Sequence, residues 1–146
     1  MVYVVSDIHE WEYDQLVQLW EASVRATHHF LNEEDIQYFK PLIRNNYLYD
    51  VTLKVARNKE NFVIGFLGVA EDNIEMLFIH PDYSGKGAGK ALVNYAINKL
   101  GSRKVDVNEQ NQQAVGFYER LGFKTTSRSG IDAFGKPYSI LHMELD

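Results

Sequence analysis

The stretch of residues 74–100, IEMLFIHPDYSGKGAGKALVNYAINKL, decides the fold of this chain, because it joins an apolar strand, a glycine-rich turn and a helix. It begins with a nearly continuous apolar run that ends at His80-Pro81-Asp82. Such a run is typical of a strand that is buried on both faces, so we expect it inside a sheet.

The turn at residues 84–89 reads Ser-Gly-Lys-Gly-Ala-Gly and precedes a predicted helix that begins near Lys90 and stops at Gly101. Glycine at alternate positions lets backbone N–H groups converge where the helix begins, and such a site binds anions, phosphate above all. The spacing fits neither a nucleoside-triphosphate loop nor a dinucleotide fingerprint, although Asp106 lies near the place of an acidic ribose partner. A turn that only caps the helix is the structural alternative.

A second motif lies at residues 105–123, VDVNEQNQQAVGFYERLGF, where a strand ends at Asn108 and a helix is predicted from about Asn111 to Leu121. This motif resembles the second signature of the GNAT superfamily of acetyl-CoA-dependent N-acetyltransferases. The resemblance lies in the spacing Asn108-x-x-Asn111-x-x-Ala114-x-x-Phe117-Tyr118-x-x-x-Gly122-Phe123. Residues 77–81 and the glycine turn resemble the coenzyme A signature of the same superfamily. Residues 23–31 and 135–138 look like its small YjaB-type bacterial members.

The resemblance implies an α/β fold in which a strongly twisted mixed sheet is flanked by helices on both faces, and its central strands splay apart to hold coenzyme A. The resemblance also implies the element order β-α-α-β-β-β-α-β-α-β-β, and periodicity supports the individual elements. The further strands are expected at residues 2–5, 51–57, 62–69, 124–130 and 138–145, and the further helices at 12–26 and from 32 toward 47, with a kink or restart at Pro41. At 146 residues, we expect one domain, 1–146.

The residues that the resemblance assigns to coenzyme binding lie in the two motifs. They are Leu77, Phe78, Ile79, Ser84, Gly85, Lys86, Gly87, Ala88, Gly89, Lys90, Asn108, Asn111, Phe117 and Tyr118. Ser84 stands where the family usually has Arg or Gln, so this chain lacks one charge for the coenzyme, which Lys86 and Lys90 can supply. We expect Asn111 to cap its helix and bond the pantetheine amide, and Asn108 to stabilise the splayed strand.

Amide formation from a thioester needs a base and an acid, because an alkylammonium with a pKa of about 10.4 must lose a proton and the departing thiolate benefits from gaining one. Tyr118 occupies the family's tyrosine position and is the predicted acid, with aromatic packing beside Phe117 as the alternative. Glu75 is the leading candidate base, because the resemblance implies a strand glutamate in this role and burial would raise its pKa; a surface or salt-bridged glutamate is the alternative. Other candidate bases are His28, His29, His80 and His142.

An aromatic wall suits an alkylammonium through cation–π contact. The side chains predicted to line the acceptor pocket are Trp20, His28, Phe30 and Tyr138, with Phe134 near the last of them. Core packing is the alternative role for Trp20 and Phe30.

Composition narrows the classes of partner. A net charge of −5 disfavours nucleic acid and favours a cationic acceptor, and the absence of cysteine excludes disulfides and a cysteine acyl-enzyme. The histidines do not have the spacing of a metal site. The N-terminal MVYVVSDIHE lacks a secretory pattern and no apolar run reaches membrane-spanning length, so we expect a cytoplasmic protein without a membrane partner.

The predicted reaction is transfer of the acetyl group of acetyl-CoA, without a metal, to a primary amine by direct attack through a tetrahedral intermediate. The acceptor can be a small molecule or a peptide, and the protein a monomer or a homodimer. A non-catalytic acyl-CoA-binding sensor and a generic nucleotide-phosphate binder are the alternatives.

Overall fold

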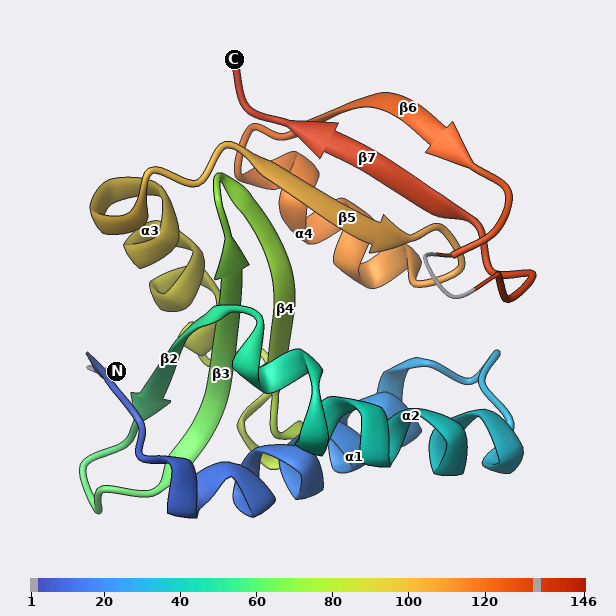
Figure 1. Cartoon of the computed structure of the whole chain (residues 1–146). Coiled ribbons are helices and arrows are strands. Elements are labelled where there is room, and N and C mark those ends of the chain that lie inside the picture. The colour runs from blue at the N-terminus through green and yellow to red at the C-terminus, as the bar shows by residue number, and fades with distance from the viewer. Residues whose placement is uncertain (1–2, 133–134) are drawn as a thin grey trace.

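The computed structural model describes residues 3–132 and 135–146, which form a twisted sheet with helices on both faces (Figure 1). The strands are β1 (Val4–Ser6), β2 (Thr52–Arg57), β3 (Val63–Ala70), β4 (Asn73–Ile79), β5 (Lys104–Asn108), β6 (Lys124–Ser129) and β7 (Ile140–Glu144). The α-helices are α1 (Tyr13–Thr27), α2 (Glu33–Asn45), α3 (Ala88–Leu100) and α4 (Gln112–Arg120). This order along the chain confirms the predicted order of elements.

The sheet has seven strands in the order β1-β2-β3-β4-β5-β7-β6. The pair β4–β5 is parallel and its other neighbouring strands are antiparallel, so the sheet is mixed, as predicted. The last strand of the chain, β7, lies between β5 and β6 and pairs with both. This topology brings residues of three strands together on one face.

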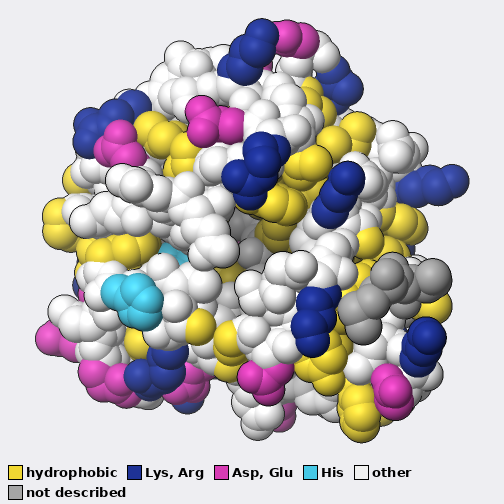
Figure 2. Space-filling view, turned by 180° about the vertical axis from the view of Figure 1, so that it is seen from behind, with side chains coloured by type: hydrophobic (Ala, Val, Ile, Leu, Met, Phe, Trp, Pro, Cys, Tyr) yellow, Lys and Arg dark blue, Asp and Glu magenta, His cyan; other side chains and the backbone are white. Residues whose placement is uncertain are grey.

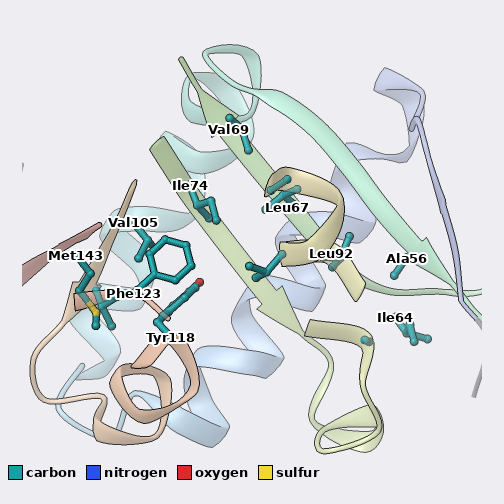
Figure 3. Packing of buried hydrophobic residues seen from close by; sticks show 14 residues of the cluster. Ala56, Ile64, Leu67, Val69, Ile74, Leu92, Val105, Tyr118, Phe123 and Met143 are labelled. Atoms are coloured by element: carbon teal, nitrogen blue, oxygen red, sulfur yellow. The ribbon is translucent and has the colours of Figure 1, made fainter. Parts of the chain in front are cut away.

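Two hydrophobic cores lie on opposite faces of the sheet. Phe66 and Leu67 are neighbours on β3 and are both buried, but they belong to different cores, because successive side chains of a strand point to opposite faces. One core, drawn in Figure 3, joins β3 and β4 to α3 and α4 through residues such as Leu92 and Tyr118. The other joins the same strands to α1 and α2 through residues such as Trp20.

The central strand β4 is less buried than its apolar sequence predicts. Its pairing with β5 covers only Asn73 with Lys104 and Ile74 with Val105. Of the β4 residues, Ile74 alone is buried, so the prediction of a strand buried on both faces is wrong. The physical reason is that β5 turns away from β4 after these two pairs and leaves residues 75–79 uncovered on that side (Figure 1).

A β-bulge interrupts β4 at Glu75. Val69 of β3 pairs with Ile74 and Gly68 pairs with Met76, so Glu75 faces no residue of β3. The extra residue changes the alternation of side chains, because Ile74 and Leu77 pack into the same core.

Two helices add detail to the sequence prediction. Helix α2 runs as one element through Pro41 to Asn45, so of the predicted kink or restart at Pro41 the structure excludes the restart, since proline removes only one backbone donor and the helix is fixed by its buried face. Helix α3 begins at Ala88, two residues before the predicted start at Lys90, because Gly87 is its N-cap residue.

Candidate active site

The glycine-rich turn leaves the N-terminus of α3 without a side-chain cap. Gly85 and Gly87 have φ of +74° and +92°, in the left-handed region that favours glycine. Gly87 is the N-cap residue, so no side-chain hydrogen bond from it satisfies the first amides of the helix. A Cβ added at either glycine would meet no atom within 4 Å. This open turn fits a phosphate group, whose oxygens accept hydrogen bonds from bare N–H groups at a helix start.

Two contacts fix the turn from outside. The Tyr3 hydroxyl donates a hydrogen bond of 2.9 Å to the backbone oxygen of Lys86. Ahead of the turn, Nδ1 of His80 accepts a hydrogen bond of 3.1 Å from the backbone nitrogen of Asp82 and caps the 3₁₀ helix Pro81–Tyr83. His80 is therefore engaged in the structure of the turn.

The other predicted coenzyme-binding residues of the turn differ in exposure. Ser84, Lys86 and Lys90 are exposed, whereas Ala88 is buried and can offer a ligand only its backbone amide. A Cβ added at Gly89 would lie 3.4 Å from the Phe117 ring, which is an ordinary van der Waals contact, so the start of α3 lies beside α4. Figure 2 shows Lys and Arg side chains around the central hollow of one face, with Asp and Glu mostly toward its edges.

The predicted splay of the central strands is present between β4 and β5. Beyond Ile74, the edge of β4 that faces β5 has no strand partner in the described part of the chain. The side chains of Leu77 and Ile79 pack against the core under α3, and Phe78 points into the core under α1. An unpaired strand edge of this kind can hydrogen-bond an extended ligand.

The two asparagines of the second motif lie at the mouth of this splay. Asn111 is the N-cap of α4, and its Oδ1 accepts a hydrogen bond of 3.2 Å from the backbone nitrogen of Ala114, which confirms the predicted cap. Its Nδ2 lies 3.5 Å from Nε2 of His28 on the other side of the sheet. Asn108 ends β5, and its backbone oxygen accepts a hydrogen bond of 3.0 Å from the Asn111 nitrogen.

Tyr118 projects from α4 toward β4 (Figure 3) and is 5% exposed. Its ring makes edge contacts with Phe117 and Phe123 at centroid distances of 5.1 and 5.5 Å. Burial raises the pKa of Tyr118, so the phenol is protonated near neutral pH. No described residue forms a hydrogen bond with its hydroxyl, which leaves this proton free to be donated to a ligand in the splay.

A cavity of about 720 Å³ lies on the opposite side of β4, between α1, α2 and the strands β5, β6 and β7. Three of the four predicted acceptor-pocket residues line it: Trp20, His28 and Tyr138. Phe30 lies behind this wall, with its ring 5.3 Å from His28 and 5.4 Å from Tyr138, so it supports the lining rather than forming it. Phe134 lies outside the described residues.

The loop that carries Tyr138 is tied to α2. The Tyr138 hydroxyl donates a hydrogen bond to the buried carboxylate of Asp35, and this bond raises the pKa of Tyr138 to about 12. Asp35 itself completes the N-terminal capping of α2 with Asn32. The cavity wall is thus fixed to a helix start.

The cavity contains several carboxylates and no basic side chain apart from histidine among the described residues. The acidic residues that line it are Asp50, Glu75, Asp106 and Asp132. The predicted role of Glu75 as the base depended on burial, but its side chain is exposed, because the bulge lifts it out of the strand pairing. Glu75 therefore lies at the correct cavity without the predicted burial.

The histidines separate into distinct environments. His29 is exposed and does not line the cavity, and His80 is engaged in the turn. Burial, with a smaller contribution from His29, lowers the pKa of His28 to about 4. The Thr27 hydroxyl donates its one hydrogen to the Ser23 carbonyl, so its oxygen can only accept from the neighbouring His28 ring. Nδ1–H of His28 therefore donates to Thr27 Oγ1 at 2.8 Å, and Nε2 of the ring accepts from Asn111. His28 is a neutral, weak base.

The neutral state of His28 predicts a pH dependence of stability. Its folded pKa lies below the unfolded value of about 6.5, so the unfolded chain binds more protons between pH 6.5 and 4 and stability falls as the pH falls through this window. We expect a loss of up to about 3 kcal/mol from this residue. Urea unfolding across the window should show a weaker pH dependence in His28→Gln than in the matched control His29→Gln. Equal slopes would contradict the assignment.

Two cavity residues that contact His142 were not predicted as site residues. Ser129 on β6 and Asp106 on β5 both contact His142 of β7, through bonds of 2.7 Å each. The sequence signal for them is weak, because it shows Ile140, His142 and Glu144 alternating on a strand but does not show which strands lie beside it. Within the described residues, no group of His, Asp or Glu is placed to hold a metal ion, and no helix is long and apolar enough to cross a membrane.

An uncapped helix start behind a splayed strand pair, with an acidic and aromatic cavity across the sheet, is the arrangement expected of an enzyme that brings an anionic and a cationic substrate together. A family model for the acetyltransferase (GNAT) domain matches residues 21–144. The chain belongs to the GNAT family of acetyltransferases and is an N-acetyltransferase. This membership confirms the predicted fold, the enzyme class and acetyl-CoA as the acetyl donor.

Individual relatives support the family assignment. The chain is 42% identical over 132 residues to the peptidyl-lysine N-acetyltransferase YjaB of Escherichia coli strain K12, with 90% of this chain and 89% of YjaB covered. It superimposes on the solution structure of apo-form Escherichia coli YjaB with a TM-score of 0.90 and 40% identity, over 99% of this chain and 97% of that one. The PaiA N-acetyltransferase of Thermoplasma acidophilum, crystallised with coenzyme A, shares the fold with a TM-score of 0.76 at 21% identity, over 99% of each chain.

Proposed function

We propose that this protein transfers the acetyl group of acetyl-CoA to the side-chain amine of lysine in peptides or proteins. The observation that carries the proposal is the cavity of about 720 Å³, which combines four carboxylates with aromatic walls. A lysine side chain has an apolar stem and a cationic end, and these match the two kinds of lining. The similarity to YjaB, a protein named for peptidyl-lysine acetylation, supports the same acceptor.

The donor site follows from the turn and the splay. The bare amides at the start of α3 would bind the diphosphate, and the free edge of β4 at Leu77 and Ile79 would pair with the pantetheine arm. Asn111 would bond the same arm, and Asn108 would stabilise the strand end beside it. The thioester would then lie between the Tyr118 hydroxyl and the cavity across β4.

Two side chains have proposed roles at the reacting centre. Tyr118 would donate a proton to the departing sulfur, since its phenol is protonated and its hydroxyl has no partner in the described part of the chain. Glu75 would attract the ammonium group to the cavity by charge, because its carboxylate is exposed at the bulge of β4.

The test compares acceptors at saturating acetyl-CoA by thiol release and by mass spectrometry of the product. A lysine-containing peptide with a blocked N-terminus should gain one acetyl group at the side-chain amine, with kcat/KM at least tenfold above that for spermidine or free amino acids. The same peptide with arginine in place of lysine is the matched control and should remain unmodified.

Two results would contradict the proposal in different ways. Preference for a polyamine or an amino acid would replace the acceptor class and keep the enzyme class. Binding of acetyl-CoA without turnover of any amine would favour the non-catalytic sensor. The single domain, the cytoplasmic location and the choice between monomer and homodimer stay predictions.

A further inference from the structure

Three polar side chains on adjacent strands form a hydrogen-bonded row along the cavity. Asp106 on β5 lies opposite His142 on β7, and Ser129 on β6 lies opposite Ile140, two residues before His142. Asp106 Oδ1 lies 2.7 Å from Nδ1 of His142, and Ser129 Oγ lies 2.7 Å from Nε2 of the same ring. All three residues line the cavity.

The donors and acceptors of this row fix the tautomer of the ring. An ionised carboxylate can only accept, so Nδ1–H of His142 donates to Asp106. Nε2 then carries the lone pair and accepts the hydrogen of the Ser129 hydroxyl. The oxygen of Ser129 keeps its own lone pairs for an N–H group that enters the cavity.

The row differs from every other candidate base of the described chain. His28 donates to Thr27 and faces the amide of Asn111, so both of its ring nitrogens are engaged within the protein. Glu75 has no neighbouring group that would hold or pass on a proton, since no described residue forms a hydrogen bond or ion pair with its side chain. Only His142 joins a carboxylate on one ring nitrogen to a hydroxyl on the other, which is the arrangement of an oriented base.

We propose that Ser129, His142 and Asp106 form the proton relay that deprotonates the amine acceptor. The inference rests on the proposed function, because it requires a cationic amine in the cavity. Ser129 contacts the ammonium group, His142 receives the proton through the serine hydroxyl, and Asp106 orients the ring and stabilises its charged form. Ser129 is the catalytic residue of the row, and the other two act through it.

The proton balance of the reaction is complete. The ammonium gives one proton to Ser129 Oγ while the serine proton moves to Nε2 of His142, which becomes an imidazolium beside Asp106. The neutral amine then forms the C–N bond at the acetyl carbonyl and the C–S bond breaks. Tyr118 gives its proton to the departing sulfur, the nitrogen releases its second proton to the Tyr118 phenolate as the amide forms, and the imidazolium returns its proton to solvent.

The first experiment measures kcat against pH for lysine-peptide acetylation at saturating acetyl-CoA. In the wild-type protein, we expect kcat to rise along one limb as the pH increases, because the relay must be unprotonated to accept the proton of the amine. In His142→Gln, this limb should disappear and kcat should fall about a hundredfold, as is typical for loss of a general base, with the affinity for acetyl-CoA unchanged. Ser129→Ala should lower kcat by a similar factor.

Matched controls are available for both substitutions. Ser127→Ala changes an exposed serine on the same strand, and His29→Gln changes an exposed histidine outside the cavity, so both should keep the wild-type profile. The titratable groups that face the cavity from other elements can also produce a pH limb. They are Glu75, Asp50, Asp132, His28, Tyr47 and Tyr138. Loss of the limb in Glu75→Gln instead of His142→Gln would overturn the relay.

A second experiment needs no turnover and therefore separates failure of the relay from failure of the proposed function. Nitrogen-15 NMR of the His142 ring should show Nδ1 protonated and Nε2 bare, and Asp106→Asn should disturb this tautomer, because an amide that can also donate replaces a carboxylate that can only accept. The opposite tautomer in the wild-type protein, or an unchanged tautomer in Asp106→Asn, would overturn the relay. So would an acetyl group trapped on Ser129 after mixing with acetyl-CoA alone, because that would make Ser129 a nucleophile.

Discussion

Replacing Tyr118 by phenylalanine is expected to lower kcat for amine acetylation about a hundredfold, which is the usual size of a lost general acid. The substitution removes only the hydroxyl, which points toward β4 (Figure 3). Burial raises the pKa of Tyr118, so the phenol stays a donor across the pH range in which the enzyme would be assayed. The ring contacts with Phe117 and Phe123 remain, and the thermal unfolding midpoint should change little.

The measurement combines initial rates with the affinity for acetyl-CoA, determined by calorimetry. Affinity should be unchanged, because a transition-state interaction lowers kcat without weakening ground-state binding. Tyr95→Phe is the matched control, since Tyr95 lies on α3 beside Lys54 and does not line the cavity. An unchanged kcat in Tyr118→Phe would assign the residue to aromatic packing and place the acid elsewhere.

Replacing Gly87 by valine is expected to weaken acetyl-CoA binding about a hundredfold. The side chain would enter the open space over the turn and keep phosphate oxygens from the first amides of α3. Hydrogen bonds to a charged group contribute roughly 1.5–3 kcal/mol each, and about 2.7 kcal/mol corresponds to a hundredfold change in affinity. The φ of +92° adds strain of about 1–2 kcal/mol to the folded state.

The other end of the same helix supplies the control. Gly101 has φ of +72° and, like Gly87, no atom within 4 Å of an added Cβ. Gly101→Val should therefore cost a similar amount of stability and leave the affinity for acetyl-CoA unchanged. Equal affinities of the two variants in calorimetry would show that the turn is only a helix start.

The fold was predictable because each element has its own local pattern. The glycines of the turn, the Asn111 cap and the strand periodicities placed every main element, and the two motifs identified the family. The start of α3 was predicted two residues too late, because the conformation of Gly87 decides it, and the packing of α2 decides that this helix does not restart at Pro41. Three of the four residues predicted for the acceptor pocket line the cavity, and their role there stays a prediction.

The remaining part of the site depends on long-range register. Asp106 and Ser129 lie on either side of His142 because β7 lies between β5 and β6 in the sheet. No local sequence pattern predicts this strand order. The sequence does not predict the bulge at Glu75 either, since the bulge is defined by the pairing of β4 with β3. Apolar β4 residues were predicted as buried because the sequence does not show how soon β5 departs.

The bulge of β4 divides one strand between the two sides of the sheet. After Glu75, the side chains of Met76 and Phe78 line the cavity, whereas those of Leu77 and Ile79 pack under α3, behind the glycine-rich turn. Residues of the same five-residue stretch, 75–79, thus alternate between the cavity wall and the packing beneath the turn. If the cavity holds the amine, as proposed, substitutions at Met76 and Phe78 are expected to change the acceptor preference and to leave the packing behind the turn in place.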